Sequence, residues 1–304
     1  MKNSMESIFL NEIEQLNLDY LELKESKEYR IGKKMLALRS FTLRKAIKAI
    51  RSRFYFRSVH QFLPRENLKE NERAGIARPA EKLYKIAVYS CVTGQYDSGN
   101  CPYIYPSGIQ YVMYSDQETY DGWSIRRLPP WITDVRSGIY INRYVKFHPF
   151  ELFGGEYDYA VYLDGNITPV SDLSVWAELT DDTYGIAFHE HCGRSCIYEE
   201  YKACRAMKKG NLKHLKKQMM KYKKEGFPKD YGMLEGNAFI VNLKNDQAKR
   251  LLHECWEELC RTRGGRDQIV WPYILWKNRI HPSRITTLGK NVYQDAKLRI
   301  TDHM

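Results

Sequence analysis

The fold is best predicted from residues 158–166, which read DYAVYLDGN. The first six residues form a short apolar run rich in aromatic side chains, and such a run is typical of a buried strand. Gly165 permits a tight turn directly after the run, and Pro169 prevents an immediate helix. The sequence therefore predicts a strand that brings the side chains of Asp164 and Asn166 to one edge of a sheet.

Asp164 and Asn166 have the chemistry of a divalent-cation site. A cation that carries a sugar diphosphate needs hard oxygen ligands, and this turn offers a carboxylate and an amide carbonyl with a single residue between them. Such a cation would offset the charge that develops on a departing diphosphate. The alternative is a plain Asp-Gly turn that binds nothing.

Four further apolar runs alternate with loops and helical stretches. This alternation predicts a mainly parallel α/β sheet. Ligands of such sheets bind beyond the carboxyl ends of the strands, so the residues that follow each run are the candidates for a site. The predicted strands are 84–92, 109–114, 183–188 and 238–243, and the predicted helices are 197–224 and 245–260.

Polar residues follow the first two predicted strands. After the first come Thr93 and Gly94, where a glycine lets the backbone approach a ligand, and then Tyr96 and Asp97. The Tyr96 ring can stack on a base, and Asp97 can accept a hydrogen bond from a ribose or a base. Asp116 follows the second strand at the same predicted edge. The alternative interpretation of each is an ordinary strand-ending turn.

A dense polar cluster, residues 189–196 (HEHCGRSC), follows the strand 183–188. A zinc site is one interpretation, but the ligands are crowded and no second pair lies at a suitable spacing. A phosphate or sugar site is favoured, because His191 and Arg194 precede a predicted helix whose N-terminus attracts anions.

Two later segments also carry polar residues near strand or helix ends. Glu235 and Asn237 precede the strand 238–243, and Asp267 and Gln268 follow a Gly-Gly pair. Asp267 can act as a base or bind a sugar hydroxyl, although its spacing alone favours a helix cap.

The net charge of +11 and the pI near 9.1 imply an anionic partner. Residues 202–224 contain ten Lys or Arg and no acidic residue, and residues 42–57 combine an apolar stripe with an otherwise basic surface. Both segments favour an anionic membrane surface, and the first also suits a polyanionic acceptor. The alternatives are a solvated basic face and, for 42–57, a helix docked on the core. No motif that recognises DNA or RNA accompanies the charge, so we expect no nucleic-acid partner.

The sequence divides into a helical extension (1–64), a polar linker (65–82) and a folded domain (83–304). In the extension, apolar residues recur at spacings of four and three, which predicts a short helical seam that packs on the domain or on a second subunit in a homodimer. The seam residues are Phe9, Ile13, Leu16, Tyr20 and Leu23.

No run of 18 apolar residues and no secretory signal occurs in the sequence. The seven cysteines are an odd number scattered along the chain, which favours reduced thiols over a disulfide framework. We therefore expect a cytoplasmic protein that binds peripherally to the inner face of the plasma membrane.

Six motifs occur in a fixed order along the chain. They are Thr93-Gly94-x-Tyr96-Asp97, Ser115-Asp116, Lys146-x-His148-Pro149, Tyr162-Leu163-Asp164-Gly165-Asn166, His191-x-x-Arg194-x-Cys196-Ile197-Tyr198-x-Glu200 and Arg266-Asp267-Gln268. On these motifs, residues 84–280 resemble a glycosyltransferase-like domain, first catalogued as a domain of unknown function, that occurs in plant mucilage- and pectin-associated proteins and in bacterial polysaccharide enzymes. Asn237, Asn242-Leu243 and Asp267-Gln268 also resemble glycosyltransferase family 8.

The resemblance implies a GT-A fold over residues 83–304, a nucleotide-sugar donor, and Mn²⁺ or Mg²⁺ at the Asp164 turn. Its further metal ligands would be Asn166 and the late His281. The turn reads Asp-Gly-Asn where the family pattern is Asp-x-Asp, so one carboxylate is missing. The residues that the resemblance assigns to the donor are Thr93, Gly94, Tyr96, Asp97, Asp116, Lys146, His191, Arg194 and Gln268.

On the sugar and acceptor side, the resemblance implies Glu235, Asn237 and Asp267. The likeness to family 8 favours retention of the anomeric configuration. An inverting enzyme would need a carboxylate base that faces the acceptor hydroxyl, and Asp267 is then the candidate.

We therefore expect a glycosyltransferase that acts on a surface polysaccharide or a lipid-linked glycan. A sugar nucleotidylyltransferase would share the sheet, but it needs a Gly-rich phosphate loop with a basic residue after the first strand, where this chain reads TGQYD. The alternative from another class is a non-catalytic basic scaffold that binds a membrane or a polyanion.

Overall fold

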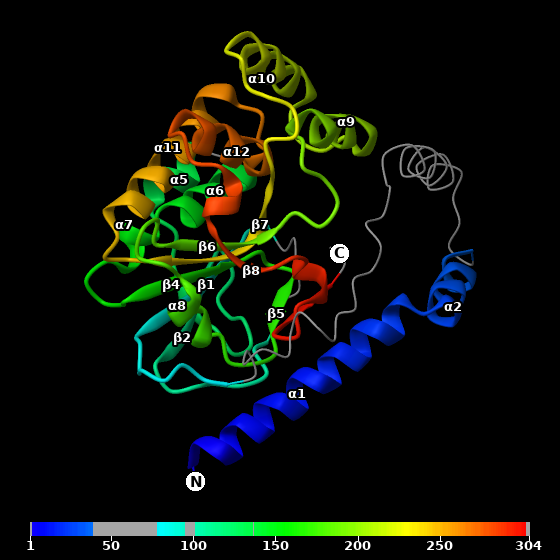
Figure 1. Ribbon diagram of the computed structural model, residues 1–304, viewed down its shortest axis with the longest axis vertical. Helices are drawn as coiled ribbons and strands as arrows, with labels where there is room; N and C mark the ends of the chain where they lie inside the picture. The colour runs from blue at the N-terminus through cyan, green and yellow to red at the C-terminus, as the bar shows by residue number, and fades with distance from the viewer. Residues whose placement is uncertain (1, 39–77, 95–100, 136, 302–304) are drawn as a thin grey trace.

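The computed structural model describes residues 2–38, 78–94, 101–135 and 137–301 (Figure 1). The predicted basic helix 42–57 and the predicted donor residues Tyr96 and Asp97 lie outside these ranges. The boundary between the linker 65–82 and the folded domain therefore stays a prediction.

A seven-stranded sheet forms the centre of the domain, with the strand order β3-β2-β1-β4-β7-β6-β8. Every strand runs in the same direction except β7, which is antiparallel to both β4 and β6. The strands are β1 (Ile86–Val92), β2 (Ile109–Ser115), β3 (Ser124–Arg126), β4 (Tyr159–Leu163), β6 (Ile186–Glu190), β7 (Leu234–Asn242) and β8 (Thr286–Gly289). This sheet confirms the predicted α/β fold, a Rossmann-like arrangement of the GT-A type.

The larger hydrophobic core lies on the face of the sheet that most helices cover (Figure 1). Successive strand residues point to opposite faces, so Tyr89, Tyr162 and Phe239 share this face and lie in one cluster with Trp271. The helices that contribute to this core are α5 (Pro130–Val135), α6 (Gly138–Phe147), α7 (Pro149–Phe153), α9 (Ile197–Met207), α10 (Leu212–Lys224), α11 (Asp246–Thr262) and α12 (Asp267–Lys277).

A second core fills the opposite face, where Val88, Val161 and Ile240 pack with Trp176 and Leu298. Full burial of each large side chain contributes roughly 2 kcal/mol or more, so both faces stabilise the sheet. The elements on this side are α8 (Val175–Leu179), the antiparallel pair β5 (Ile167–Pro169) and β9 (Leu298–Ile300), and the 3₁₀ turn η2 (Val292–Gln294). Another 3₁₀ turn, η1 (Pro282–Arg284), leads into β8.

The reversed direction of β7 matters for function. Because β7 is antiparallel to β4, its amino-terminal residues lie at the edge where β4 and β6 end. Glu235 and Asn237 are both in this part of β7, where the pairing with β6 shifts register between Phe188 and His189. β7 thus begins earlier than the predicted strand 238–243, and the residues at its start join residues that follow β4 and β6.

The helix α1 (Lys2–Glu25) contacts β9 of the domain. The helix α2 (Lys27–Leu38) follows α1 in the chain. The Asn17 side-chain amide donates to the backbone carbonyls of Ala296 and Leu298, at 2.9 Å each. Glu14 forms a buried ion pair with Lys297. The contact satisfies these buried polar groups, which would otherwise cost stability.

The predicted seam of α1 makes only part of this contact, through Tyr20, whose ring centre lies 4.1 Å from the Arg299 guanidinium carbon. The side that docks carries Leu10, Glu14, Asn17 and Leu21, which are buried. Phe9, Leu16 and Leu23 lie on another side of the helix and are 56%, 66% and 60% exposed. Packing of the seam on the domain is therefore partial, because Ile13 and Tyr20 are half-buried while the other three seam residues are exposed. Packing on a second subunit stays a prediction.

The predicted helix 197–224 is two helices, α9 and α10. The break lies at Lys208, which adopts the left-handed conformation with φ of 54°, and at Gly210, with φ of +74°. A Cβ atom on Gly210 would lie 2.8 Å from the Gly264 carbonyl oxygen, so only glycine fits where these backbones approach. The periodic pattern alone did not indicate this turn.

Candidate active site

Asp164 stands in the turn after β4, as predicted. Its backbone N–H donates to the Asn237 carbonyl at 2.8 Å, so the turn is fixed to β7. Its carboxylate accepts a hydrogen bond from the Tyr162 hydroxyl at 2.8 Å and is 28% exposed. The side chain is thus held in place by buried neighbours while part of it faces solvent.

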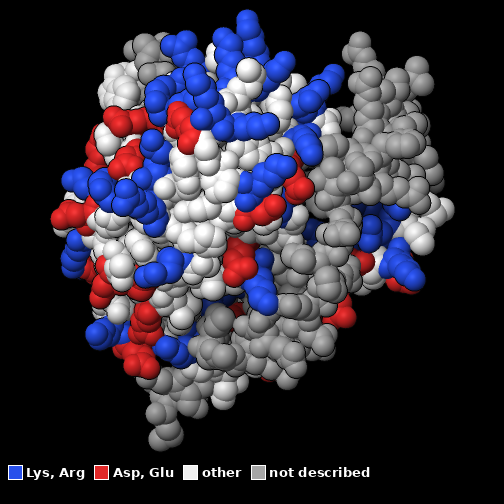
Figure 2. All heavy atoms as spheres, turned by 45° about the horizontal axis from the view of Figure 1, so that its top comes forward, with Lys and Arg blue, Asp and Glu red and all other residues white. Residues whose placement is uncertain are grey.

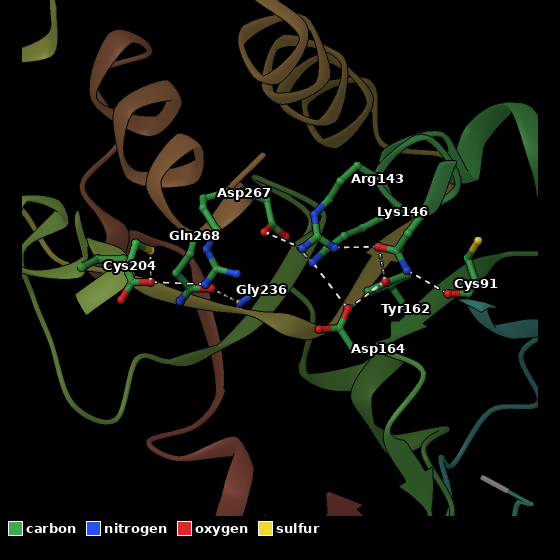
Figure 3. Close-up of polar contacts among 12 residues, drawn as sticks. Cys91, Arg143, Lys146, Tyr162, Asp164, Cys204, Gly236, Asp267 and Gln268 are labelled. Atoms are coloured by element: carbon green, nitrogen blue, oxygen red, sulfur yellow. Dashed lines mark hydrogen bonds and ion pairs between the residues drawn. The ribbon is translucent and has the colours of Figure 1, made fainter. Parts of the chain in front are cut away.

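Two cations from α6 lie beside this carboxylate (Figure 3). The Lys146 ammonium is buried, binds the Asp267 carboxylate, and lies 4.0 Å from Asp164 Oδ1. Arg143 Nη2 lies 3.1 Å from Asp267 Oδ1. The Lys146 ammonium also lies 4.7 Å from the centre of the Tyr162 ring, which is a cation–π contact. Two positive and two negative charges therefore meet at the carboxyl end of β4.

Asp267 is the first residue of α12 and is almost completely buried. Burial alone would raise the pKa of Asp267, but the charges of Arg143, Lys146 and Arg266 outweigh it and hold that pKa below its usual range. A carboxylate paired in this way stays ionised at neutral pH and is a weak base, because a cation lies next to each of its oxygens. The role of a general base, which the sequence suggested for Asp267, does not fit these surroundings.

Glu235 has the opposite character. Burial raises its pKa to about 8, and the nearby negative charges of Glu200 and Asp164 act in the same direction. The Glu235 carboxyl group therefore holds its proton at neutral pH and can exchange that proton with a bound molecule near pH 8. Of the two candidate carboxyl groups, Glu235 is the one whose pKa suits proton transfer.

His191 lies next to Glu235, with 4.0 Å between His191 Nε2 and a Glu235 carboxylate oxygen. His191 Nδ1 accepts hydrogen bonds from the backbone N–H groups of Gly193 and Arg194, at 3.1 and 3.2 Å. Burial and the charge of Arg194 lower the pKa of His191 to about 4. The ring is therefore neutral at physiological pH, and its Nε2 lies 3.4 Å from Arg194 Nη2 as well as next to Glu235.

Arg194 is occupied by an internal partner. Its Nε lies 2.7 Å from Glu200 Oε2, and Arg266 Nη2 lies 3.3 Å from the other oxygen of Glu200. This Arg-Glu-Arg group joins the loop after β6, the helix α9 and the start of α12. It orders the backbone around His191 and Asp267, and it leaves one net positive charge on this side of the site.

The strand ends predicted to hold the nucleoside lie together. The Gly94 N–H donates to both carboxylate oxygens of Asp116, at 2.9 and 3.2 Å, and Gly94 has φ of +66°. Thr93 immediately precedes this turn. Asn142 of α6 links the same edge to the site, because it donates to the Cys91 carbonyl at 2.8 Å and accepts from Tyr162 at 3.2 Å.

Three other predicted residues differ in their surroundings. Gln268 is buried and bridges the backbone of β7, accepting from Gly236 N–H at 3.3 Å and donating to the Leu234 carbonyl at 2.7 Å. It thus positions β7, which carries Glu235 and Asn237. The Asn166 side-chain amide donates to the Thr301 carbonyl at 2.8 Å, which leaves its own oxygen available.

His281 has partners other than the residues of the Asp164 turn. It comes after α12, whose 11 residues extend about 16 Å from Asp267. Its ring contacts Tyr231, with 5.1 Å between ring centres, and its Nδ1 lies 2.8 Å from the Ser283 hydroxyl. His281 caps η1, so the structure does not place it as a ligand of a cation at Asp164.

Oxygen donors suited to Mn²⁺ or Mg²⁺ do occur at the turn. Asp164 supplies a carboxylate, and Asn166 supplies an amide oxygen. The Asn237 side-chain oxygen is shielded from solvent without a hydrogen-bond partner, so a bound group that donates to or coordinates it would relieve an unsatisfied atom. Among the described residues, His191, Cys192 and Glu235 also place ligand atoms within 4.8 Å of one another, in a set with softer chemistry.

Sequence reasoning missed Arg143, Glu200 and Arg266 as functional candidates. Arg143 precedes Lys146 by three residues, and residues at that spacing face the same way on a helix, so the Lys146 motif could have indicated it. Glu200 and Arg266 stand within two of the six motifs, but nothing local in the sequence shows that they pair with each other.

Comparisons with known proteins identify the family of the chain. The family model described as TOD1/MUCI70, glycosyltransferase-like domain, matches residues 141–300, which run from within α6 to the end of β9 and make up just over half of the chain. The matched segment contains Lys146, Asp164, Glu235 and Asp267. No curated protein matches the chain. The chain belongs to the TOD1/MUCI70 family of glycosyltransferase-like domains.

Proposed function

We propose that this protein transfers a sugar from a nucleoside-diphosphate donor to a surface polysaccharide or a lipid-linked glycan. Membership of the glycosyltransferase-like family supports the general activity. The observation that carries the specific proposal is the partly exposed Asp164 carboxylate, which lies beside the buried Lys146 ammonium of α6 at the carboxyl end of β4. Ligands of open α/β sheets bind at this edge.

A divalent cation, Mn²⁺ or Mg²⁺, would be held by Asp164 and Asn166. When bound, it would neutralise the charge on the departing diphosphate. Lys146 and Arg143 keep Asp267 ionised and Asp164 oriented, so the protein part of the site is arranged before the donor binds. Gly94 and Asp116, at the ends of β1 and β2, would contact the nucleoside.

Glu235 replaces Asp267 as our candidate for the base that takes the proton of the acceptor hydroxyl. It acts in its ionised form, which reaches half of the population near pH 8. It is buried, its pKa is about 8, and the neutral His191 lies next to it. A base in this position would favour inversion of the anomeric carbon, whereas the likeness to family 8 favours retention. The anomer of the first-formed product, followed by NMR, distinguishes the two stereochemical outcomes.

The experiment that tests the function is turnover of a panel of nucleotide sugars, with and without Mn²⁺, by the full chain and by Asp164→Ala. We expect the substitution to abolish turnover of the accepted donor. The matched control is Asp158→Ala, which removes a carboxylate from the opposite end of the same strand, where Asp158 pairs with Lys244. Equal loss in both variants, or turnover that survives Asp164→Ala, would contradict the proposal.

A further inference from the structure

The outward sides of α9 and α10 carry a dense positive surface that sugar transfer does not use. We call it the α9–α10 basic surface. Its exposed cations are Lys202, Arg205, Lys208, Lys209, Lys213, Lys216, Lys217, Lys223 and Lys224. Figure 2, in which the top of Figure 1 comes forward, shows Lys and Arg side chains gathered at this end of the molecule. The sequence from 201 to 224 has no acidic residue to offset them.

The packing of α10 explains why these charges face outward. Leu215, Met219 and Tyr222 are buried against the domain, so the remaining sides of the helix are left for lysines. Lys221 turns inward and pairs with Glu225 and Glu258.

Within the described part of the chain, Lys213, Lys216 and Lys217 make no ion pair. Their mutual repulsion destabilises the isolated protein slightly. Binding to an anionic surface would remove this repulsion.

We propose that the α9–α10 basic surface docks the protein on an anionic lipid bilayer. Met220 is 64% exposed and lies between the lysines of α10, which suits contact with the boundary between headgroups and acyl chains. Lysine side chains reach phosphate groups with their ammonium ends while their methylene stems cover apolar surface. One helix thus presents an exposed methionine for the acyl-chain boundary of a bilayer and unpaired lysines for its phosphate groups.

A soluble polyanion matches this surface less well. Proteins that bind extended polymers combine positive charge with a groove or with exposed aromatic rings. The exposed side chains of α10 include no aromatic ring, since Tyr222 is buried. Charge and an exposed methionine on a convex helix therefore favour a membrane.

The α9–α10 basic surface is connected to the candidate site. The helix α9 begins at Ile197, three residues after Arg194, and Glu200 of α9 binds Arg194. A bilayer on this surface would lie beside the edge that carries Glu235, and a lipid-linked acceptor would reach the site from the membrane. This last step rests on the proposed function, whereas the docking itself does not.

The test is flotation of the full chain with vesicles of phosphatidylglycerol mixed with phosphatidylcholine, compared with pure phosphatidylcholine. We expect binding to the anionic vesicles only, and weaker binding as salt increases. The triple variant Lys213→Gln, Lys216→Gln, Lys217→Gln should bind about 100-fold more weakly, since each lysine near an anionic surface is worth about a factor of five.

The control removes the same number of exposed charges elsewhere, with Lys82→Gln, Lys249→Gln and Arg284→Gln. It should bind as the unmodified protein does, and thermal melting should confirm that both variants fold. Three results would overturn the proposal: no binding to anionic vesicles, equal weakening in both triple variants, or tighter binding to heparin than to vesicles at the same ionic strength. Donor turnover, measured separately, shows whether the proposed function holds regardless of this outcome.

Discussion

Glu235→Gln should stabilise the protein, and the gain should grow with pH. The folded protein keeps the Glu235 proton up to about pH 8, whereas the unfolded chain releases it near the ordinary value of 4.5. Between these values the unfolded state binds fewer protons than the folded state. The free energy of unfolding of the unmodified protein therefore falls as pH rises. Glutamine has the same shape and no proton to release, so the variant escapes this loss.

The size of the effect follows from the pKa. Between pH 5.5 and pH 8, a range of about 2.5 pH units, Glu235 is ionised in the unfolded chain and mostly protonated in the folded protein. Over this range the free energy of unfolding falls by roughly 1.4 kcal/mol for each pH unit. The stability of Glu235→Gln relative to the unmodified protein should therefore increase by about 3 kcal/mol over this range. Above pH 8 the difference should level off, because both states of the unmodified protein are then ionised.

The assay is urea unfolding of both proteins at pH 5.5, 7 and 8.5. Other titrating groups are shared, so the difference between the proteins isolates Glu235. Glu118→Gln, which changes an exposed glutamate, serves as the control and should show no such trend. A difference for Glu235→Gln that stays constant with pH, or that shrinks as pH rises, would refute the reasoning about its burial.

Two other substitutions test the buried charges. Asp267→Asn removes the nearest carboxylate from Arg143 and Lys146 and leaves only the more distant Asp164 beside them. It should lower the free energy of unfolding by about 3 kcal/mol in urea titrations; a loss below about 1 kcal/mol would contradict the pairing. Glu14→Gln leaves Lys297 buried and unpaired, so α1 should detach first and be cleaved by trypsin at a lower temperature than in the unmodified chain. Unchanged cleavage would show that α1 does not depend on this ion pair.

The sheet could be predicted from the sequence because its signal is local. Residues 158–163 read as a buried strand on their own, and β4 occupies 159–163 of them. The turn residues after the strand were predicted for the same reason, since Gly165 and Pro169 limit what the backbone can do there. Because the carboxyl ends of parallel strands meet at one edge of the sheet, Asp164 and Asp116 could be placed on that edge without any knowledge of distant contacts.

The charge states could not be predicted in this way. Lys146 and Asp267 are 121 residues apart in the sequence, and only the packing of α6 against the other helices brings them together. Asp267 looked like a base because its burial and its partners were unknown. The same limit explains α1, where periodicity identified an apolar seam but the buried Glu14 and Asn17 decide which side docks.

The central claim is that Asp164 contributes to binding of a donor diphosphate, and calorimetric titration with nucleoside diphosphates in the presence of Mn²⁺ tests it most directly. At least one nucleoside diphosphate should bind to the unmodified protein. Asp164→Ala should weaken that binding by about tenfold or more, which corresponds to the loss of one charged ligand of roughly 1.4 kcal/mol. Asp158→Ala should bind as the unmodified protein does. If no nucleoside diphosphate binds, or if Asp164→Ala binds as tightly as Asp158→Ala, the account is wrong.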